Sequence, residues 1–361
     1  MKIIDVNRVF YKVGINTFIQ VIGRTVSVVM GIFTVYLLTH YLGVNGYGNY
    51  ILIFTSLSIF GIFADFGLHL TVVKEIAENK KNAPILNGTY FWLKIIFSIL
   101  SIIIPLIFIF VINYSFEIKL GILIGAIGIS IGSLSNFNNA LFQSKLRLDL
   151  ITLIDLISKI VSTIFLCIFV YLRFSLIFLV ASVLIGNIFS FFSSMIIAKR
   201  IYKMNYGFDI NIAIKIIIMS LPVGIMSLLT LSYFKIDTIM LSIFRGQTEL
   251  GYYGFSYKIF ENVLTLWGFY MASVFPLLAL NIHINIKKFR ELLLKSIKIA
   301  LISSLIIFFL FLLCSSYIIR FLGGGAFYQS SNSLIILLIS CPFFFVNNIF
   351  SIYTLSPPPL S

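Results

Sequence analysis

Six ionisable side chains stand inside long apolar stretches of the sequence, where a charge is costly to bury. A charged side chain at the centre of a bilayer costs about 2.5–3.5 kcal/mol on insertion scales, so each one is a candidate for function. A cation that faces a wet cavity can bind an anionic cargo such as a diphosphate, whose oxygens match a guanidinium fork. The candidate substrate-binding residues are Arg24, Asp65, Lys235, Asp237, Lys258 and Glu261.

Arg24 is the cation expected deepest in the membrane. It lies ten residues after Gly14, which is about 15 Å along a helix that rises 1.5 Å per residue. We expect it to face a cavity and bind the diphosphate. The alternative is a structural pair with a neighbouring carboxylate or with backbone carbonyls.

Four further ionisable residues flank the turn that begins at Gly246. Lys235 and Asp237 are two positions apart, so on a helix they point about 200° apart and cannot pair with each other. Lys258 and Glu261 are three positions apart and share a face, so a direct ion pair is the alternative to a substrate role. Asp237 is also expected to reach Lys258 across the turn, either as a structural clamp or as part of the substrate site.

Asp65 lies near the expected cytoplasmic end of the span at 47–70. It is interpreted either as an anchor for a helix end or as a ligand. Three lysines also lie near expected cytoplasmic ends, where a long side chain can extend to water. Snorkelling is therefore predicted for Lys94, Lys159 and Lys215.

The composition indicates an integral membrane protein made of helices. Hydrophobic residues make up 60% of the chain and charged residues 11%, so a soluble domain would expose far too much apolar surface. Aliphatic runs of about 20 residues, long enough to cross hydrocarbon about 30 Å thick, outnumber alternating patterns. Ten helical spans are predicted, at 14–41, 47–70, 88–113, 119–142, 150–172, 175–198, 213–243, 250–279, 295–318 and 331–355.

The distribution of cations predicts the orientation. Lys and Arg gather at the N-terminus and in alternate loops, and such an excess marks the cytoplasmic side. The opposite loops hold only Lys119, Arg173, Arg245 and Arg320. Both termini are therefore expected in the cytoplasm of a bacterium, with the chain in the cytoplasmic (inner) membrane. The net charge of +14 reflects this sidedness, and no soluble domain offers a nucleic-acid-binding face.

Two short patterns recur in the two halves of the chain. The pattern G-x-x-x-x-G-x-Y begins at Gly43 and again at Gly246, each time after the first span of a half. NNALF in the fourth span resembles NNIF in the tenth. We therefore predict an all-α transporter with two lobes, 1–205 with six helices and 206–361 with four, related by an axis along the membrane normal.

The second half ends earlier than the first. After NNIF the chain runs into Pro357, Pro358 and Pro359, which cannot continue a helix. The C-terminal lobe is therefore expected to be truncated by two helices.

Neither a metal site nor an enzyme is indicated. Cys167, Cys314 and Cys341 fall inside predicted spans without metal-ligand spacing, so no metal and no cofactor are expected. A polymerase or glycosyltransferase would carry its catalytic residues on a large outer loop, and the outer loops here are short. The sequence therefore favours a non-enzyme.

Several segments resemble the polysaccharide flippases of the Wzx type. They are GRTVSVVMGIFTVYLLTHYLGVNGYGNY, FADFGLHLTVVKEIA, and KIDTIML followed by LGYYGFSYKIFE. That family belongs to the superfamily that includes lipid II flippases and multidrug and toxin extruders. The resemblance implies translocation of an undecaprenyl-pyrophosphate-linked oligosaccharide, for O-antigen or capsule synthesis, without covalent chemistry. It also implies an acidic residue of importance at Asp237 and contact with the polysaccharide polymerase machinery.

Two alternatives remain open beside the flippase. A drug or cation antiporter of the same superfamily would use carboxylates in the membrane as its binding charges, whereas Arg24, Lys235 and Lys258 favour an anionic cargo. An inactive truncated remnant, or a scaffold for the synthesis machinery, is the other alternative. The structure of the glycan and the driving ion leave no mark in the sequence.

Overall fold

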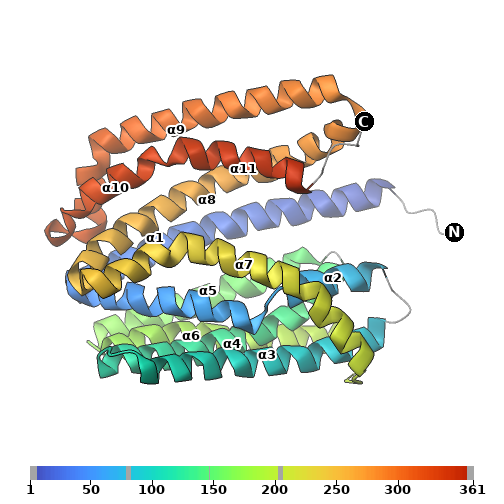
Figure 1. Cartoon of the computed structure of the whole chain (residues 1–361), viewed down its shortest axis with the longest axis horizontal. Helices are drawn as coiled ribbons and strands as arrows, with labels where there is room; N and C mark the ends of the chain where they lie inside the picture. Colours follow the sequence, from blue (N-terminus) through green and yellow to red (C-terminus); the bar gives the residue numbers. More distant parts are fainter. Residues whose placement is uncertain (1–5, 79–82, 146, 202–205, 356–361) are drawn as a thin grey trace. The chain divides into compact units, whose positions relative to one another are not determined.

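The computed structural model of the chain describes residues 6–78, 83–145, 147–201 and 206–355, and within them it contains helices and no strand. These helices form two compact units, Met1–Gln247 and Thr248–Ser361 (Figure 1). The predicted all-α class is therefore confirmed.

The first unit contains a bundle of long apolar helices with one short helical turn between the first two. Apolar side chains dominate the long helices on all sides. This pattern is typical of helices that contact lipid and other helices, whereas a helix of a soluble protein has one apolar and one polar face. In chain order the elements are α1 (Val6–Gly61), η1 (Ile62–Ala64), α2 (Leu68–Glu78), α3 (Ala83–Val111), α4 (Phe116–Ser144), α5 (Leu148–Tyr171), α6 (Leu176–Ile201) and α7 (Ile210–Phe244).

α1 contains two of the predicted spans. The apolar stretch Ile19–Ile76 has 58 residues, which as one straight helix would be about 87 Å long and far exceed a bilayer. Gly43 interrupts the helical backbone with φ 63° and ψ −172°. The chain reverses direction within α1, as Figure 1 shows. The predicted turn between 14–41 and 47–70 therefore exists.

A second break corrects the prediction of one continuous helix over 47–70. The helix ends at Gly61, passes through η1, and resumes only at Leu68 in α2. Between them Phe66 and Gly67 have φ of 42° and 81°, which a right-handed helix cannot accommodate. Apart from Asp65 the residues around this break are apolar, so hydropathy alone does not reveal it.

Small residues let α4 and α6 approach their neighbours closely. A Cβ added to Gly121 would collide with Ile53 of α1. A Cβ added to Gly186 of α6 would lie 2.9 Å from both the Ser158 carbonyl oxygen and the Cβ of Ser162 on α5. Close helix contact of this kind is how helices associate in lipid, where no hydrophobic force draws them together.

α7 packs against other helices of the first unit. Its residues Ala213 and Ile216 join a buried cluster with side chains from α2, α3 and α4, among them Leu68 and Tyr90. Lys215 of α7 also forms an ion pair of 2.9 Å with Glu75 of α2, whose side chain is 5% exposed. The predicted division into lobes at 205 and 206, which follows the repeat, stays a prediction.

In its described part the second unit holds four helices and one short turn. They are α8 (Gln247–Ile284), α9 (Ile286–Gly323), η2 (Gly325–Phe327), α10 (Ser330–Ile339) and α11 (Cys341–Leu355). Trp267 of α8 stacks on Phe345 of α11 with ring centroids 4.4 Å apart, and the Ser256 hydroxyl donates to the Ser330 carbonyl oxygen at 2.7 Å. Aromatic stacking thus connects α8 to α11, and a serine hydrogen bond connects α8 to α10.

Eight helical stretches within the described residues are long and apolar enough to cross a membrane, or up to nine if α8 is included. α8 bends by 46° between Gln247–Met271 and Ser273–Ile282. The first of the eight stretches contains two predicted spans. A multi-pass membrane protein is therefore confirmed, and the proline run Pro357–Pro359 lies outside the described residues.

Candidate functional site

The break between α1 and α2 leaves backbone oxygens without helical partners, and side chains from two neighbouring helices satisfy them. The Ala64 carbonyl oxygen accepts hydrogen bonds from Ser133 Oγ of α4 at 2.7 Å and from Lys94 Nζ of α3 at 3.3 Å. Lys94 Nζ also donates to Ser133 Oγ at 3.0 Å and forms an ion pair with Asp65. Four groups thus hold the break in one geometry.

The prediction that Lys94 snorkels to water is wrong. Its side chain is completely buried, while the carboxylate of Asp65 is 31% exposed. A buried ammonium is tolerated only when it is paired and hydrogen-bonded, and here a carboxylate, a hydroxyl and a carbonyl surround it. The charge that the sequence places near a helix end is a structural anchor inside the bundle.

Asp65 also contacts the start of α2. Its Oδ2 accepts from the backbone N–H of His69 at 3.4 Å. The His69 ring lies 3.0 Å from Gln143 Oε1 and 3.3 Å from the Asn136 carbonyl oxygen, both on α4. These are the contacts expected of an anchor for a helix end, and they tie α2 to α4.

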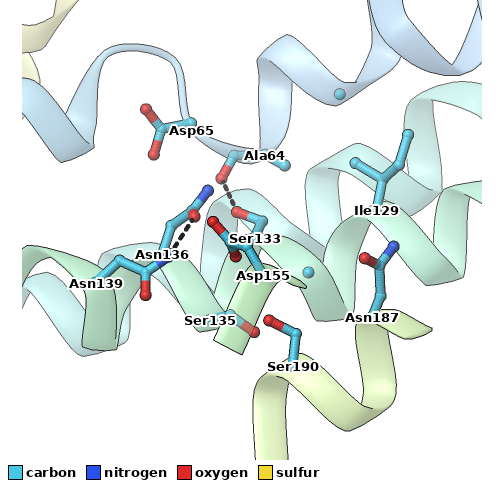
Figure 2. A pocket seen from close by; sticks show the side chains of 12 residues that line it. Ala64, Asp65, Ile129, Ser133, Ser135, Asn136, Asn139, Asp155, Asn187 and Ser190 are labelled. Atoms are coloured by element: carbon cyan, nitrogen blue, oxygen red, sulfur yellow. Dashed lines mark hydrogen bonds between the residues drawn. The ribbon is translucent and has the colours of Figure 1, made fainter. Parts of the chain in front are cut away.

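Next to this anchor lies a polar pocket of about 320 Å³, shown in Figure 2. Its walls come from the end of α1 and η1 and from α4, α5 and α6. The lining residues are Gly61, Ala64, Asp65, Ile129, Gly132, Ser133, Ser135, Asn136, Asn139, Asp155, Asn187 and Ser190. Amide, hydroxyl and carboxylate groups dominate this lining, which is unusual for the interior of an apolar bundle.

Several oxygens in the pocket have no partner among the described residues. Ser135 Oγ and Asn139 Oδ1 are buried and accept no hydrogen bond, although the two residues are only 2% and 8% exposed. The exposed Asp155 carboxylate of α5 forms neither a hydrogen bond nor an ion pair within the same set. Buried polar groups are normally satisfied, so unpaired acceptors at one pocket indicate a site for a ligand or water.

The amide groups around these oxygens are held in place by local hydrogen bonds. Asn139 Nδ2 donates to Asn136 Oδ1 at 3.3 Å, and Asn187 Nδ2 donates to the Gly128 carbonyl oxygen at 3.0 Å. Since the amide nitrogens are oriented away, the carbonyl oxygen of the Asn139 side chain stays available to a donor.

Arg24 lies outside this pocket, on the surface of α1. Its neighbour Gly23 is buried, and a Cβ there would collide with Thr152 of α5, so this face of α1 packs against α5. Arg24 is exposed, and no described residue forms an ion pair or hydrogen bond with its guanidinium. The alternative of a structural pair for Arg24 therefore finds no partner in this part of the chain.

The remaining predicted residues lie on α7 and α8. Asp237 Oδ1 accepts from the backbone N–H of Thr238 at 2.6 Å and from its hydroxyl at 3.1 Å. Lys235 and Asp237 are both half-buried. Lys258 and Glu261 form the ion pair expected from their spacing, at 2.9 Å. The clamp between Asp237 and Lys258 joins different compact units and stays a prediction.

Sequence reasoning identified one residue of the pocket, Asp65, and missed the others. Asp155 stands inside the predicted span at 150–172, so the rule that singles out ionisable residues in spans points to it as well. Asn139 belongs to NNALF, which served only as a marker of the repeat. Asn136 and Asn187 are neutral and carried no signal by themselves.

Within the described residues no group of three His, Cys, Asp or Glu side chains could hold a metal ion. Cys167, Cys314 and Cys341 carry free thiols. The pocket therefore offers one unpaired carboxylate and several neutral oxygens, a set suited to noncovalent recognition.

The fold resembles that of several solved transporters. The lipid II flippase MurJ in its inward closed conformation matches with a TM-score of 0.73 at 21% identity, over 95% of this chain and 77% of that one. A multidrug resistance MATE family transporter of the MOP superfamily, inward-facing, matches at 0.63 and 14% identity, over 92% and 83%. A MOP superfamily transporter from Pyrococcus furiosus matches at 0.59 and 14% identity, over 94% and 83%. A comparison with curated protein sequences finds no match.

Two family models match the sequence itself. The MatE model matches residues 222–355, which lie in the second half. The model described as polysaccharide biosynthesis protein matches residues 13–283, which is most of the chain and includes the polar pocket. This all-helical membrane protein therefore belongs to the polysaccharide biosynthesis protein family.

Proposed function

We propose that the chain is a flippase that moves an undecaprenyl-pyrophosphate-linked oligosaccharide across the bacterial cytoplasmic membrane for synthesis of a surface polysaccharide such as O-antigen or capsule. It acts by alternating access, without covalent chemistry. The membership of the polysaccharide biosynthesis protein family and the likeness in fold to a lipid II flippase support this proposal.

The observation that carries the proposal is the state of Arg24. Arg24 carries an exposed guanidinium without a partner among the described residues, on an apolar helix, and such a charge in a membrane span is a functional candidate by default. A pyrophosphate presents oxygens in the geometry that a guanidinium binds with two parallel hydrogen bonds. Lys235, Lys258 and Asp237 are further candidate ligands, and Glu261 orients Lys258 through their ion pair.

The proposal includes an orientation and a setting. The excess of Lys and Arg at the N-terminus and in alternate loops favours cytoplasmic termini. The cargo then enters from the cytoplasmic leaflet, where lipid-linked sugars are assembled, and leaves on the periplasmic side. The polysaccharide polymerase machinery is the expected consumer of the product.

A drug or cation antiporter is the second candidate. The match of the MatE model to residues 222–355 favours it, as do the MATE family structures. Asp155, a carboxylate without a partner among the described residues, is the charge such an antiporter would use. The unpaired Arg24 favours the flippase, because a cation repels a cationic drug.

Complementation of a flippase-deficient host tests the proposal. We expect the chain to restore surface polysaccharide and Arg24→Ala to abolish it at an equal level of membrane protein. Arg24→Lys should restore it in part, because an ammonium keeps the charge but lacks the planar fork. Arg290→Ala is the matched control, since it removes an exposed arginine from the start of α9.

The antiporter makes the opposite prediction in the same host. Resistance to organic cations that depends on Asp155, with surface polysaccharide unchanged by Arg24→Ala, would contradict the flippase proposal.

A further inference from the structure

We propose that the polar pocket between η1, α4, α5 and α6 is a subsite for one sugar residue of the cargo, with Asp155, Asn139 and Ser135 as its hydrogen-bond acceptors. This inference rests on the proposed function, because it names the part of the lipid-linked oligosaccharide that the first unit recognises.

The unsatisfied acceptor atoms of the pocket favour a ligand that donates hydrogen bonds. Asn139 Oδ1 and Ser135 Oγ are buried with no described partner, in residues more than nine-tenths buried. Asp155 adds an exposed carboxylate to the same pocket, and it too has no partner among the described residues. An unmet buried acceptor is costly, and a ligand with several hydroxyl groups supplies a donor to each of the three acceptors.

The composition of the lining favours a polyol over a bare cation. A cation accepts no hydrogen bond, yet the pocket also presents donors, namely the Asn136 amide and the Ser190 hydroxyl. Figure 2 shows the Ser135 and Ser190 side chains directed toward each other at the floor of the pocket. A sugar hydroxyl both donates and accepts, so it can satisfy both kinds of group.

The size of the pocket also favours a sugar over a single ion. Its volume of about 320 Å³ is within the usual range of small-molecule pockets, about 300–1,000 Å³, and far exceeds what one ion requires. Gly132 keeps this space open, since a Cβ there would lie 3.1 Å from the amide carbon of Asn187.

The anchor beside the pocket holds the site in shape before a ligand arrives. Ser133 lines the pocket and is fixed by the Ala64 carbonyl oxygen at 2.7 Å and by Lys94 Nζ at 3.0 Å. Ala64 and Asp65, at the break in the chain, form one wall of the pocket. The buried Lys94 holds this wall in place by contacting both residues. A preorganised wall reduces the entropy that a flexible sugar chain and its site lose on binding.

The test compares two lipid probes on the purified full chain in nanodiscs. One is polyprenyl pyrophosphate carrying a single sugar, supplied as a panel of hexose, 6-deoxyhexose and N-acetylhexosamine, and the other is bare polyprenyl pyrophosphate. We expect the chain to bind at least one sugar-bearing lipid about tenfold more tightly than the bare lipid. Asp155→Asn and Asn139→Leu should remove this preference and leave the affinity for the bare lipid unchanged.

Asp149→Asn is the matched control, because it makes the same change on α5 at a residue that pairs with Arg147 outside the pocket. Asp155→Asn changes no side-chain volume, and an unaltered unfolding temperature confirms that it folds. The same nanodiscs are titrated with sodium against choline. Sodium-dependent stabilisation that Asp155→Asn abolishes, without any preference for sugar-bearing lipid, would identify an ion site and overturn the proposal.

The remaining outcomes separate this inference from the proposed function. Equal binding of the sugar-bearing and the bare lipids would overturn the sugar subsite and leave the flippase intact. Failure to bind either lipid would contradict both.

Discussion

Gly43 and Gly246, which occupy the same place in the two copies of a repeated turn, both hold a left-handed backbone, with φ of 63° and 85°. A Cβ added to either would meet nothing within 4 Å. The backbone angle, and not a lack of space, therefore requires glycine at both positions. The pattern that recurs in the sequence thus marks two turns that both place a glycine at positive φ.

Replacing either turn glycine should destabilise the protein through backbone strain. We expect Gly43→Ala and Gly246→Ala each to cost about 1–2 kcal/mol, measured as a lower unfolding temperature of the purified chain in detergent. Gly268→Ala is the control, because Gly268 is helical and a Cβ there meets nothing within 4 Å. An unchanged unfolding temperature for both turn variants would mean that these angles are not required.

Removing the buried Lys94 should be costly, and removing its partner with it should recover part of the loss. Lys94→Met leaves Asp65 without its ammonium, and breaking a buried pair costs about 3 kcal/mol. The double variant Lys94→Met/Asp65→Asn should lose less than the sum of the single variants, in a double-mutant cycle of unfolding free energies. Additive losses would show that the two side chains do not interact.

Lys258→Met is the comparison for that cycle, because the Lys258–Glu261 pair is far more exposed. Exposed pairs are worth about 0–1 kcal/mol. We expect a much smaller change there than for Lys94→Met, so a loss of equal size would contradict the anchoring role of Lys94.

The contact between α5 and α6 should tolerate no side chain at Gly186. A Cβ there approaches the Ser158 backbone carbonyl oxygen, which cannot move aside as a side chain can. We expect Gly186→Ala to cost about 1–3 kcal/mol of unfolding free energy. Since Asn187 follows directly and lines the pocket, the same variant should also weaken binding of sugar-bearing lipid, whereas unchanged stability and binding would contradict this packing.

The helices were predictable from the sequence because hydropathy acts locally. Each predicted span overlaps an observed helix, and Gly43 marks a reversal that the glycine pattern indicates. The break at Phe66 and Gly67 was not predictable in this way. Lys94, which satisfies it, lies 29 residues from Asp65, and only the folded bundle brings them together.

The pocket was missed for the same physical reason. Asn139, Asp155 and Asn187 come from three different helices, and each one alone resembles an ordinary polar interruption of an apolar segment. Their significance depends on their juxtaposition and on the oxygens of Asn139 and Asp155 that have no described partner, and composition and periodicity reveal neither. Arg24 was singled out because a lone cation in an apolar helix is conspicuous in the sequence, and its role stays a prediction.

The orientation of the chain is testable by reporter fusions at helix ends. Fusions after Ser144 and Asn285 should report the cytoplasm, and fusions after Tyr114 and Gly324 should report the periplasm. The basis is the excess of cations in alternate loops. A periplasmic signal after Ser144 would reverse the proposed direction of transport.

Transport of a labelled lipid by the reconstituted protein tests the central claim most directly. Vesicles that contain the full chain and a fluorescent polyprenyl-pyrophosphate oligosaccharide are mixed with a membrane-impermeant quencher, and the fraction of label that becomes accessible is followed with time. The account predicts that accessibility rises from the outer-leaflet fraction toward completion, and that Arg24→Ala holds it at the level of protein-free vesicles while Arg290→Ala does not. Label that stays in its original leaflet with the unmodified chain, in vesicles that transport an organic cation, would contradict it.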